Sequence, residues 1–377
     1  MKALDGHILT PRGFIRGRIG IDGRLLASVV GEPVAEVGVR DSTLPVVLPG
    51  FVDLHVHGGG GADVMDGDDA ALKVAQVHVQ HGTTTMLATT MTAPADDLRV
   101  AFAGVAAARV STNGATAAAY IHGVHLEGPF IGASKLGAQP DFTRPISLAD
   151  VQALHAVAPI TLITVAPEAA AGGEDSSISA LVQAGFRVQL GHSGASYEAA
   201  KAALDAGATG FTHLYNAMSG LHHRQPGMVG AALAHASHAE VIPDLLHVHP
   251  GAIRVALRSI AGLYCVTDST AAAGMPDGEY RLGRQLVTRC MGGVRLADGT
   301  LAGSTLTMDD ALRNLINALG LSLAEASLRT STLAADYIGA TQRGRLVAGA
   351  FADMVVFDRD LQLRDVIAEG LSVHGRD

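Results

Sequence analysis

The sequence has little cysteine and no excess of positive charge, and each shortage excludes a class of protein. Its two cysteines, Cys265 and Cys290, are too few for a disulfide framework and lack metal-ligand spacing, which favours a reducing, cytoplasmic location. The 27 Lys and Arg residues against 36 Asp and Glu residues give a formal charge of −9. A nucleic acid or an anionic membrane is therefore not expected as the main partner, and a phosphorylated substrate would need a local basic pocket.

Long apolar runs are missing as well. No uninterrupted run approaches the roughly 20 residues that span a bilayer, and the segment Met1 to His7 lacks the apolar core of a signal peptide. We therefore expect a chain that is neither exported nor anchored in a membrane. Because 48% of the residues are apolar and only 17% are charged, the chain can bury a sizeable core and is expected to be globular throughout.

From residue 46 onward, short apolar runs alternate with alanine-rich amphipathic stretches, a pattern typical of a parallel sheet covered by helices. Eight such runs are strand candidates. They lie at about 47–55, 83–89, 118–126, 160–166, 186–191, 209–213, 240–247 and 263–268. Eight parallel strands in roughly 250 residues predict an α/β fold of the closed (β/α)8 TIM-barrel type, with an open, doubly wound sheet as the alternative.

Both ends of the chain have a different texture. Residues 1–45 and 344–377 show β-type alternation and lie outside the eight strand candidates, so we expect them to pair into one small β-sandwich domain. Residues 46–343 are then expected to form the (β/α)8 barrel domain. Within it, the glycine-punctuated stretch 279–299 predicts hairpins.

Residues that can bind a metal ion follow the strand candidates. They are His55 and His57 on the first, Glu127 on the third, His192 on the fifth, His213 on the sixth, His247 on the seventh and Asp268 on the eighth. In a barrel, the carboxyl ends of all strands share one rim, where the active sites of this fold are built. Imidazoles combined with a carboxylate suit Zn²⁺ or a similar divalent ion.

Each of these residues alone also has a purely structural interpretation. His55 and His57 are two positions apart and face one side of a strand, but such a pair is weak evidence by itself. Glu127 could pair with a buried arginine, and Asp268 could cap a helix. Their joint placement favours a metal site, in which we expect Asp268 to be the general base that accepts a proton from water and later the acid that protonates the leaving amine.

Longer motifs point to a family. They are PGFVDLHVHG, HLEGPF, GHSGAS, THLYNAM, VTDSTAAAGMPDG, AGSTLTM and GRLVAGAFADMVVFD. Through these motifs the chain resembles, over nearly its whole length, the N-acetylglucosamine-6-phosphate deacetylases of the amidohydrolase superfamily. The resemblance implies a homodimer that hydrolyses the acetamide of N-acetylglucosamine 6-phosphate to glucosamine 6-phosphate and acetate.

The resemblance also implies roles for individual residues. A divalent metal, most readily Zn²⁺, would be held by Glu127, His192 and His213, with His55 and His57 available for a second ion. Asn216 and Ala217 would bind the sugar phosphate, Arg224 would reach the phosphate across a dimer interface, and His247 would contact the substrate.

Two positions depart from the family pattern. The chain reads Asp244-Leu245-Leu246-His247 where the family often has Asp-Gly-x-His, which puts the backbone around His247 in question. Gln139 stands where some members have a histidine that helps to polarise the acetyl carbonyl. Glutamine can donate a hydrogen bond but cannot carry charge.

Other functions compete with this one. The substrate could be the galacto epimer, or the chain could be another amidohydrolase that opens cyclic amides, although no lysine ends a strand candidate to serve as their carboxylated bridge. Residues 57–60 and 191–195 imitate the oxyanion loop and nucleophile elbow of a serine hydrolase, but Ala195 stands where the elbow needs glycine. A non-catalytic barrel that serves as a binding module is the last alternative. Such a barrel should have lost its metal-ligating residues first, and all of them are present.

Overall fold

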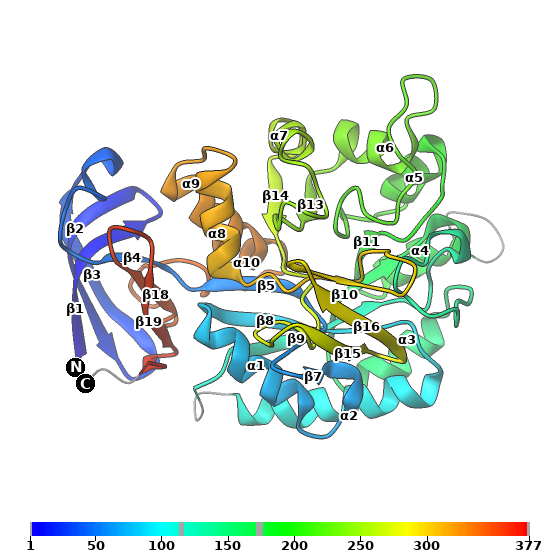
Figure 1. The fold of residues 1–377 in the computed structure, drawn as a ribbon, viewed down its shortest axis with the longest axis horizontal. Helices are drawn as coiled ribbons and strands as arrows, with labels where there is room; N and C mark the ends of the chain where they lie inside the picture. The colour runs from blue at the N-terminus through cyan, green and yellow to red at the C-terminus, as the bar shows by residue number, and fades with distance from the viewer. Residues whose placement is uncertain (1, 113–116, 171–175, 375–377) are drawn as a thin grey trace.

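The structure is a computed structural model, and it describes residues 2–112, 117–170 and 176–374. Figure 1 shows two parts: a β domain that contains both chain termini, and a larger body of strands and helices. No helix among the described residues is both long and apolar enough to cross a membrane.

Within the described residues, eight parallel strands form the barrel, which confirms the predicted fold. They are β5 (Phe51–Val56), β8 (Thr83–Thr90), β9 (Tyr120–Glu127), β10 (Ile160–Val165), β11 (Arg187–Leu190), β12 (Gly210–Phe211), β13 (His238–Val241) and β14 (Gly262–Cys265). The first six are neighbours in one sheet, and the last two pair with each other. The N–H of Leu214 donates to the Glu240 carbonyl between β12 and β13, and the N–H of Asp268 donates to the His55 carbonyl between β14 and β5. These bonds close the ring.

Several of the expected strands are shorter than the apolar pattern suggested, and for two of them the reason is clear. The run 47–55 contains two strands, because the chain leaves the terminal sheet after β4 (Val46–Pro49) and starts β5 at Phe51. The run 240–247 stops being a strand at Val241. Pro243 has no N–H to donate, and the Asp244 carboxylate accepts the N–H groups of Leu246 and His247, so His247 lies in a loop.

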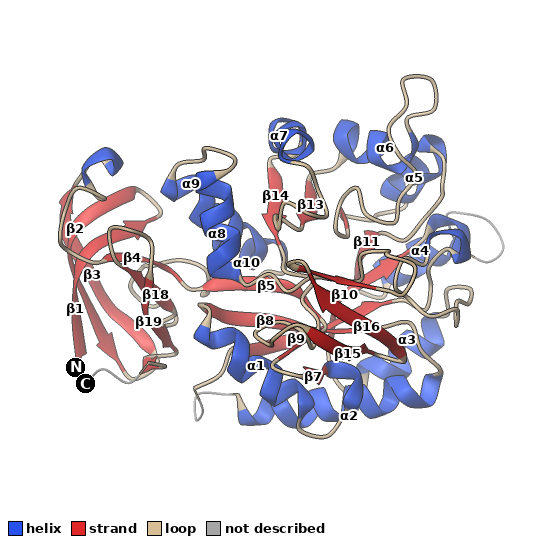
Figure 2. Ribbon diagram, viewed as in Figure 1, coloured by secondary structure: helices blue, strands red, loops and turns tan. Residues whose placement is uncertain are grey.

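Helices cover the outside of the barrel (Figure 2). They are α1 (Ala70–Gln80), α2 (Ala95–Ser111), α3 (Leu148–His155), α4 (Ser176–Gln183), α5 (Tyr197–Asp205), α6 (Gly227–His235), α7 (Pro250–Ser259), α8 (Met308–Asn317), α9 (Leu323–Ser327) and α10 (Leu333–Tyr337). Several begin at a capping side chain: the hydroxyls of Ser147, Ser196 and Ser322 each accept a backbone N–H in the first turn. The buried faces of these helices pack on the strands in one continuous apolar core.

The two chain ends form a small β domain together, as predicted. In spatial order its strands are β20 (Leu371–Ser372), β19 (Leu363–Ala368), β18 (Met354–Phe357), β4, β1 (Lys2–Thr10), β2 (Gly13–Asp22) and β3 (Leu25–Pro33). The N–H of Leu26 on edge strand β3 donates to the Ala350 carbonyl, just before β18, so the sheet curls back on itself. Ile8, Ile19, Val47 and Met354 fill the space that it encloses.

The glycine-rich stretch after β14 is an antiparallel insertion of β15 (Gly278–Leu282), β16 (Gln285–Cys290) and β17 (Gly293–Arg295). It is fixed to the barrel by the buried Asp63 carboxylate, which accepts the N–H of Gly283 at 2.8 Å. Asp63 follows the short β6 (Gly58–Gly59) in β7 (Ala62–Asp63). Leu282 and Arg295 of the insertion line the cavity at the barrel mouth.

Candidate active site

A cavity of about 580 Å³ opens at the carboxyl ends of the barrel strands. Most of the residues that the sequence singled out line it. They are His57, Glu127, Gln139, His192, His213, Asn216, Ala217, His247 and Asp268. His55 is fully buried beneath the cavity lining, and its Nε2 contacts Nε2 of His57. Arg224 is exposed and does not belong to the lining of its own chain's cavity.

One end of the Glu127 carboxylate meets two imidazoles. Oε1 lies 3.1 Å from Nε2 of His192 and 3.0 Å from Nε2 of His213, and these two nitrogens are 3.0 Å apart. Ligands about 2.0–2.1 Å from a tetrahedral Zn²⁺ lie roughly 3.3 Å from each other, so the triangle has the size of a shared cation's ligand set. The Nδ1–H of His192 donates to the Lys135 carbonyl at 2.8 Å, which leaves the Nε2 lone pair facing the cavity.

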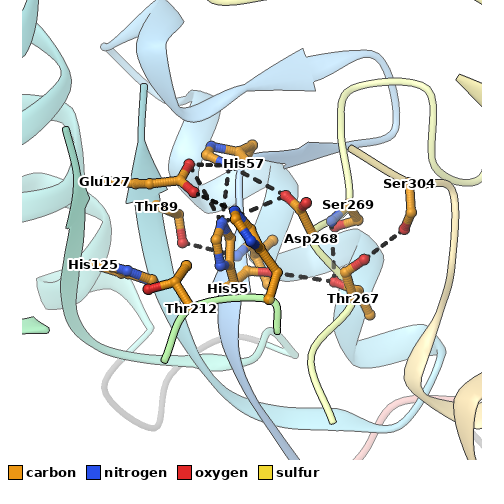
Figure 3. Close-up of polar contacts among 12 residues, drawn as sticks. His55, His57, Thr89, His125, Glu127, Thr212, Thr267, Asp268, Ser269 and Ser304 are labelled. Carbon is orange, nitrogen blue, oxygen red and sulfur yellow. Dashed lines mark hydrogen bonds and ion pairs between the residues drawn. The ribbon is translucent and has the colours of Figure 1, made fainter. Parts of the chain in front are cut away.

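The other end of the same carboxylate meets a second pair of imidazoles (Figure 3). Oε2 of Glu127 lies 3.1 Å from Nε2 of His57 and 3.5 Å from Nε2 of His55, and the two nitrogens are 3.1 Å apart. Oδ1 of Asp268 lies 3.4 Å from His55 and 3.3 Å from His57. Glu127 therefore stands between two groups of metal-ligand type, each formed by three residues.

The loops hold these side chains at a cost in backbone energy. His192, His213 and Asp268 have φ values of 46°, 29° and 50°, in the left-handed region that non-glycine residues rarely adopt. The Asp268 carbonyl is fixed by the N–H of Ser304 at 2.7 Å. A Cβ on Gly303 would come within 2.8 Å of that carbonyl, so this close approach requires glycine.

The charges of the site depend on one another. Burial opposes ionisation of the Glu127 carboxyl, but the imidazoles of His55 and His192 outweigh it and hold its pKa well below the usual value. Burial likewise opposes ionisation of Asp268, yet His55 and His57 lower its pKa to about 2. Against burial, the carboxylates of Asp268 and Glu127 raise the pKa of His57 to about 9. Such a site binds positive charge, and a divalent cation can take the place of these protons.

The two departures from the family pattern have clear local structures. Leu245 adopts φ 65°, a conformation suited to glycine, and the backbone still places Oδ2 of Asp244 2.6 Å from Nδ1 of His247. The Asp–His pair thus forms without glycine. Gln139 donates from Nε2 to Oε2 of Glu127 at 2.6 Å and accepts the N–H of Thr92 at 2.7 Å, so its amide is held on both sides.

The serine of the GHSGA stretch is not placed as a nucleophile. Ser193 is fully buried, and its hydroxyl donates to Glu168 at 2.5 Å. Glu168 also accepts the N–H of Gly194 at 2.9 Å. This carboxylate therefore fixes the loop that carries His192, and the serine hydrolase alternative fails on geometry.

Sequence reasoning missed three residues of this region. Lys135 and Arg295 line the cavity and bring positive charge to it. Nothing in their local sequence marks them, because they reach the barrel mouth from a loop and from the insertion. Glu240 is fully buried behind His55. A carboxylate between the apolar residues Ala239 and Val241 of β13 was a usable signal, of the kind that drew attention to Glu127.

Comparisons with known proteins agree with this geometry. Residues 46–373 match the Amidohydrolase family. The chain is 38% identical to the N-acetylglucosamine-6-phosphate deacetylase of Lysinibacillus sphaericus, over 86% of this chain and 84% of that protein. It is also 38% identical to the N-acetylgalactosamine-6-phosphate deacetylase of Escherichia coli O157:H7, over 97% of both. A variant of the N-acetyl-D-glucosamine-6-phosphate deacetylase from Mycobacterium smegmatis, solved in complex with N-acetyl-D-glucosamine 6-phosphate, superposes with a TM-score of 0.88 at 33% identity and 98% coverage of both chains.

Proposed function

The chain belongs to the amidohydrolase family, and on that premise we propose that it deacetylates an N-acetyl amino-sugar 6-phosphate. The reaction is hydrolysis of the acetamide of N-acetylglucosamine 6-phosphate to glucosamine 6-phosphate and acetate. The observation that carries this function is the Glu127 carboxylate shared by two imidazole groups at the barrel mouth, with Asp268 beside them. Deacetylases of this substrate class that are 38% identical over most of the chain support the substrate.

Glu127, His192 and His213 would hold one divalent ion, with Zn²⁺ the best match to two imidazoles and a carboxylate. When bound, such an ion supplies Lewis acidity that polarises the amide carbonyl and makes water a better nucleophile at neutral pH. His55 and His57, with the second oxygen of Glu127 and Asp268, would hold a second ion. The shared carboxylate supports a binuclear centre.

Asp268 would carry the proton. Positive charge beside it, on the imidazoles of His55 and His57 or on an ion that they would bind, lowers its pKa and keeps the carboxylate ionised. Its backbone is fixed by Ser304. It can accept the proton that water loses when the oxygen bonds to the acetyl carbon. The same proton can then pass to the sugar nitrogen as the C–N bond breaks, which releases acetate and the free amine.

The substrate side of the cavity suits an anion. Lys135 and Arg295 bring positive charge to the lining of a chain whose formal charge is −9. We propose that Asn216 and Ala217 bind the sugar phosphate and that His247, oriented by Asp244, contacts the sugar. Arg224 would complete the phosphate site from the partner of a homodimer, since it is exposed and outside its own cavity.

Both cysteines are free, which supports a cytoplasmic location.

An acetate-release assay tests the function and its epimer. The panel contains the 6-phosphates of N-acetylglucosamine and N-acetylgalactosamine and both sugars without phosphate. We expect turnover of the gluco 6-phosphate and a kcat/KM for the unphosphorylated sugars at least about 100-fold lower, since charged hydrogen bonds contribute about 1.5–3 kcal/mol each. Preference for the galacto 6-phosphate would reassign the epimer, and equal turnover of unphosphorylated sugar would contradict the phosphate assignment.

A further inference from the structure

A third carboxylate lies beneath the candidate metal site. Glu240, on β13, is fully buried, on the side of His55 that faces away from the cavity. Its Oε2 lies 3.0 Å from Nδ1 of His55 and accepts the backbone N–H of His213 at 3.1 Å. Its Oε1 accepts the Tyr264 hydroxyl at 3.3 Å. An isolated buried carboxylate would be strongly unfavourable, so these three contacts account for its presence in the barrel interior.

Glu240 could itself be mistaken for a metal ligand. Donor atoms of His55, His125 and Glu240 lie within 4.8 Å of one another. However, both ring nitrogens of His125 already have partners: Nδ1 lies 3.0 Å from the Leu54 carbonyl and Nε2 lies 2.7 Å from the Thr164 hydroxyl. No free lone pair of His125 faces this group. The cluster is therefore a hydrogen-bonded support and not a third metal site.

The contacts of Glu240 decide which nitrogen of His55 carries the proton. Oε2 is an acceptor, because it already receives the N–H of His213, so Nδ1 of His55 must be the donor. A neutral imidazole protonated at Nδ1 has its lone pair at Nε2. That atom points into the cluster, 3.1 Å from Nε2 of His57 and 3.5 Å from Oε2 of Glu127. This is the form of histidine that binds a metal ion through Nε2.

We propose that Glu240 is the positioning residue of the second metal position: it holds His55 in the tautomer and orientation that bind the ion next to His57. The inference rests on the proposed metal-dependent function. Through the His213 backbone, which has a φ of 29°, the same oxygen also supports a ligand of the first position. Glu240 thereby links the two proposed metal positions on the side of the barrel interior, as Glu127 does on the side of the cavity.

Three substitutions test whether the length or the charge of the Glu240 side chain supports His55. Glu240→Gln keeps the reach, and the His213 N–H requires the amide oxygen to face His55, so the tautomer is preserved. Glu240→Asp keeps the charge but withdraws the carboxylate by one methylene. Tyr264→Phe is the matched control, because it removes a contact of Oε1 without touching Oε2. Should the Asp variant fail to fold, Glu240→Leu makes the same test with an apolar side chain of similar size.

The measurements are metal content after dialysis at fixed free Zn²⁺, Zn²⁺ affinity by chelator competition, and the absorption spectrum of the Co²⁺ form. We expect two ions in the wild-type, Gln and Phe proteins. In the Asp or Leu protein we expect second-ion affinity to fall about 10–100-fold, with a Co²⁺ spectrum of single occupancy. Two ions at wild-type affinity in the Asp or Leu protein, or an equal loss in the Phe control, would overturn the proposal. A wild-type protein that binds one ion and still releases acetate would also overturn it. A wild-type protein that takes up no metal ion and releases no acetate would overturn the proposed function itself.

Discussion

The side-chain amide of Gln139 donates a hydrogen bond to the Glu127 carboxylate, with 2.6 Å between Nε2 and Oε2. The same oxygen of Glu127 faces His57, so Gln139 contacts the group that lies between the two imidazole pairs. Because its own carbonyl oxygen is held by the Thr92 N–H, the amide cannot turn over without losing a bond. Gln139 thus orients Glu127, the proposed shared metal ligand, in addition to lining the cavity.

Replacing Gln139 with alanine should destabilise the protein. The change leaves the buried N–H of Thr92 without its partner and removes a donor from Glu127, and each buried unsatisfied group costs about 1–3 kcal/mol. Urea unfolding of the metal-free protein measures the loss. The control is Gln183→Ala, at an exposed position on α4, which should change stability by about 0.5 kcal/mol or less. Equal stability of the two variants would contradict this account of Gln139.

Asp268→Asn should abolish most of the activity while the protein stays folded. The amide keeps the shape of the side chain but cannot accept and return a proton, so kcat should fall about 100- to 10,000-fold. Acetate release and Zn²⁺ content are measured together, so that a loss of metal is not mistaken for a loss of the base. Asp205→Asn, on the surface of α5, is the control and should keep wild-type kcat. An Asp268→Asn protein with more than about a tenth of that activity would exclude Asp268 as the proton carrier.

The sequence predicted much of this arrangement, because polar residues placed at the carboxyl ends of barrel strands all lie at one rim of the barrel. Glu127 ends β9 and Asp268 follows β14, and closure of the ring brings such positions together whatever their distance along the chain. What the sequence could not predict is set by tertiary contacts. Arg295 reaches the cavity because contacts such as that of Asp63 with Gly283 hold the insertion on the barrel, and Glu240 contacts His55 across the barrel interior.

Leu245 offers a direct test of backbone strain. At φ 65° a non-glycine residue is unfavourable, while the side chain of Leu245 also packs on the core. Leu245→Gly and Leu245→Ala lose the same apolar contacts beyond Cβ, but only glycine relieves the strain. The Gly variant should therefore be more stable than the Ala variant by about 0.5–1 kcal/mol in urea unfolding, after allowing for the greater freedom of glycine in the unfolded chain. At the exposed helical Val255 the order should reverse, since there alanine is the better helix former.

His78 should make the protein sensitive to mild acid. Burial lowers the pKa of His78 to about 4; Nε2 donates to the Gly58 carbonyl, and Nδ1 has no partner for a second proton. The folded state keeps the ring neutral, whereas the unfolded chain binds a proton below about pH 6.5. The contribution of His78 to stability is thus complete above pH 6.5 and is lost as the pH falls toward 4. Between pH 7 and 5 it should cost about 2 kcal/mol.

Urea unfolding of the metal-free protein at both pH values measures this loss. His78→Gln keeps a donor that can reach the Gly58 carbonyl but cannot titrate, so its stability should fall less over the same interval. Parallel pH profiles for the wild-type and Gln proteins would exclude His78 as the sensitive group.

The position of Arg224 predicts that one subunit completes the active site of another. Arg224→Ala should raise KM for the sugar phosphate about 10- to 100-fold, with a smaller effect on kcat and little effect on unphosphorylated sugar.

The decisive experiment mixes this variant with Asp268→Asn under conditions that exchange subunits. If Arg224 acts on the partner's cavity, a hybrid dimer has one site that combines both defects and one site that is intact. Random mixing of equal amounts makes half of the dimers hybrids, so about a quarter of wild-type activity should return at low substrate. If Arg224 acted within its own subunit, every site would carry one defect, and mixing would restore nothing.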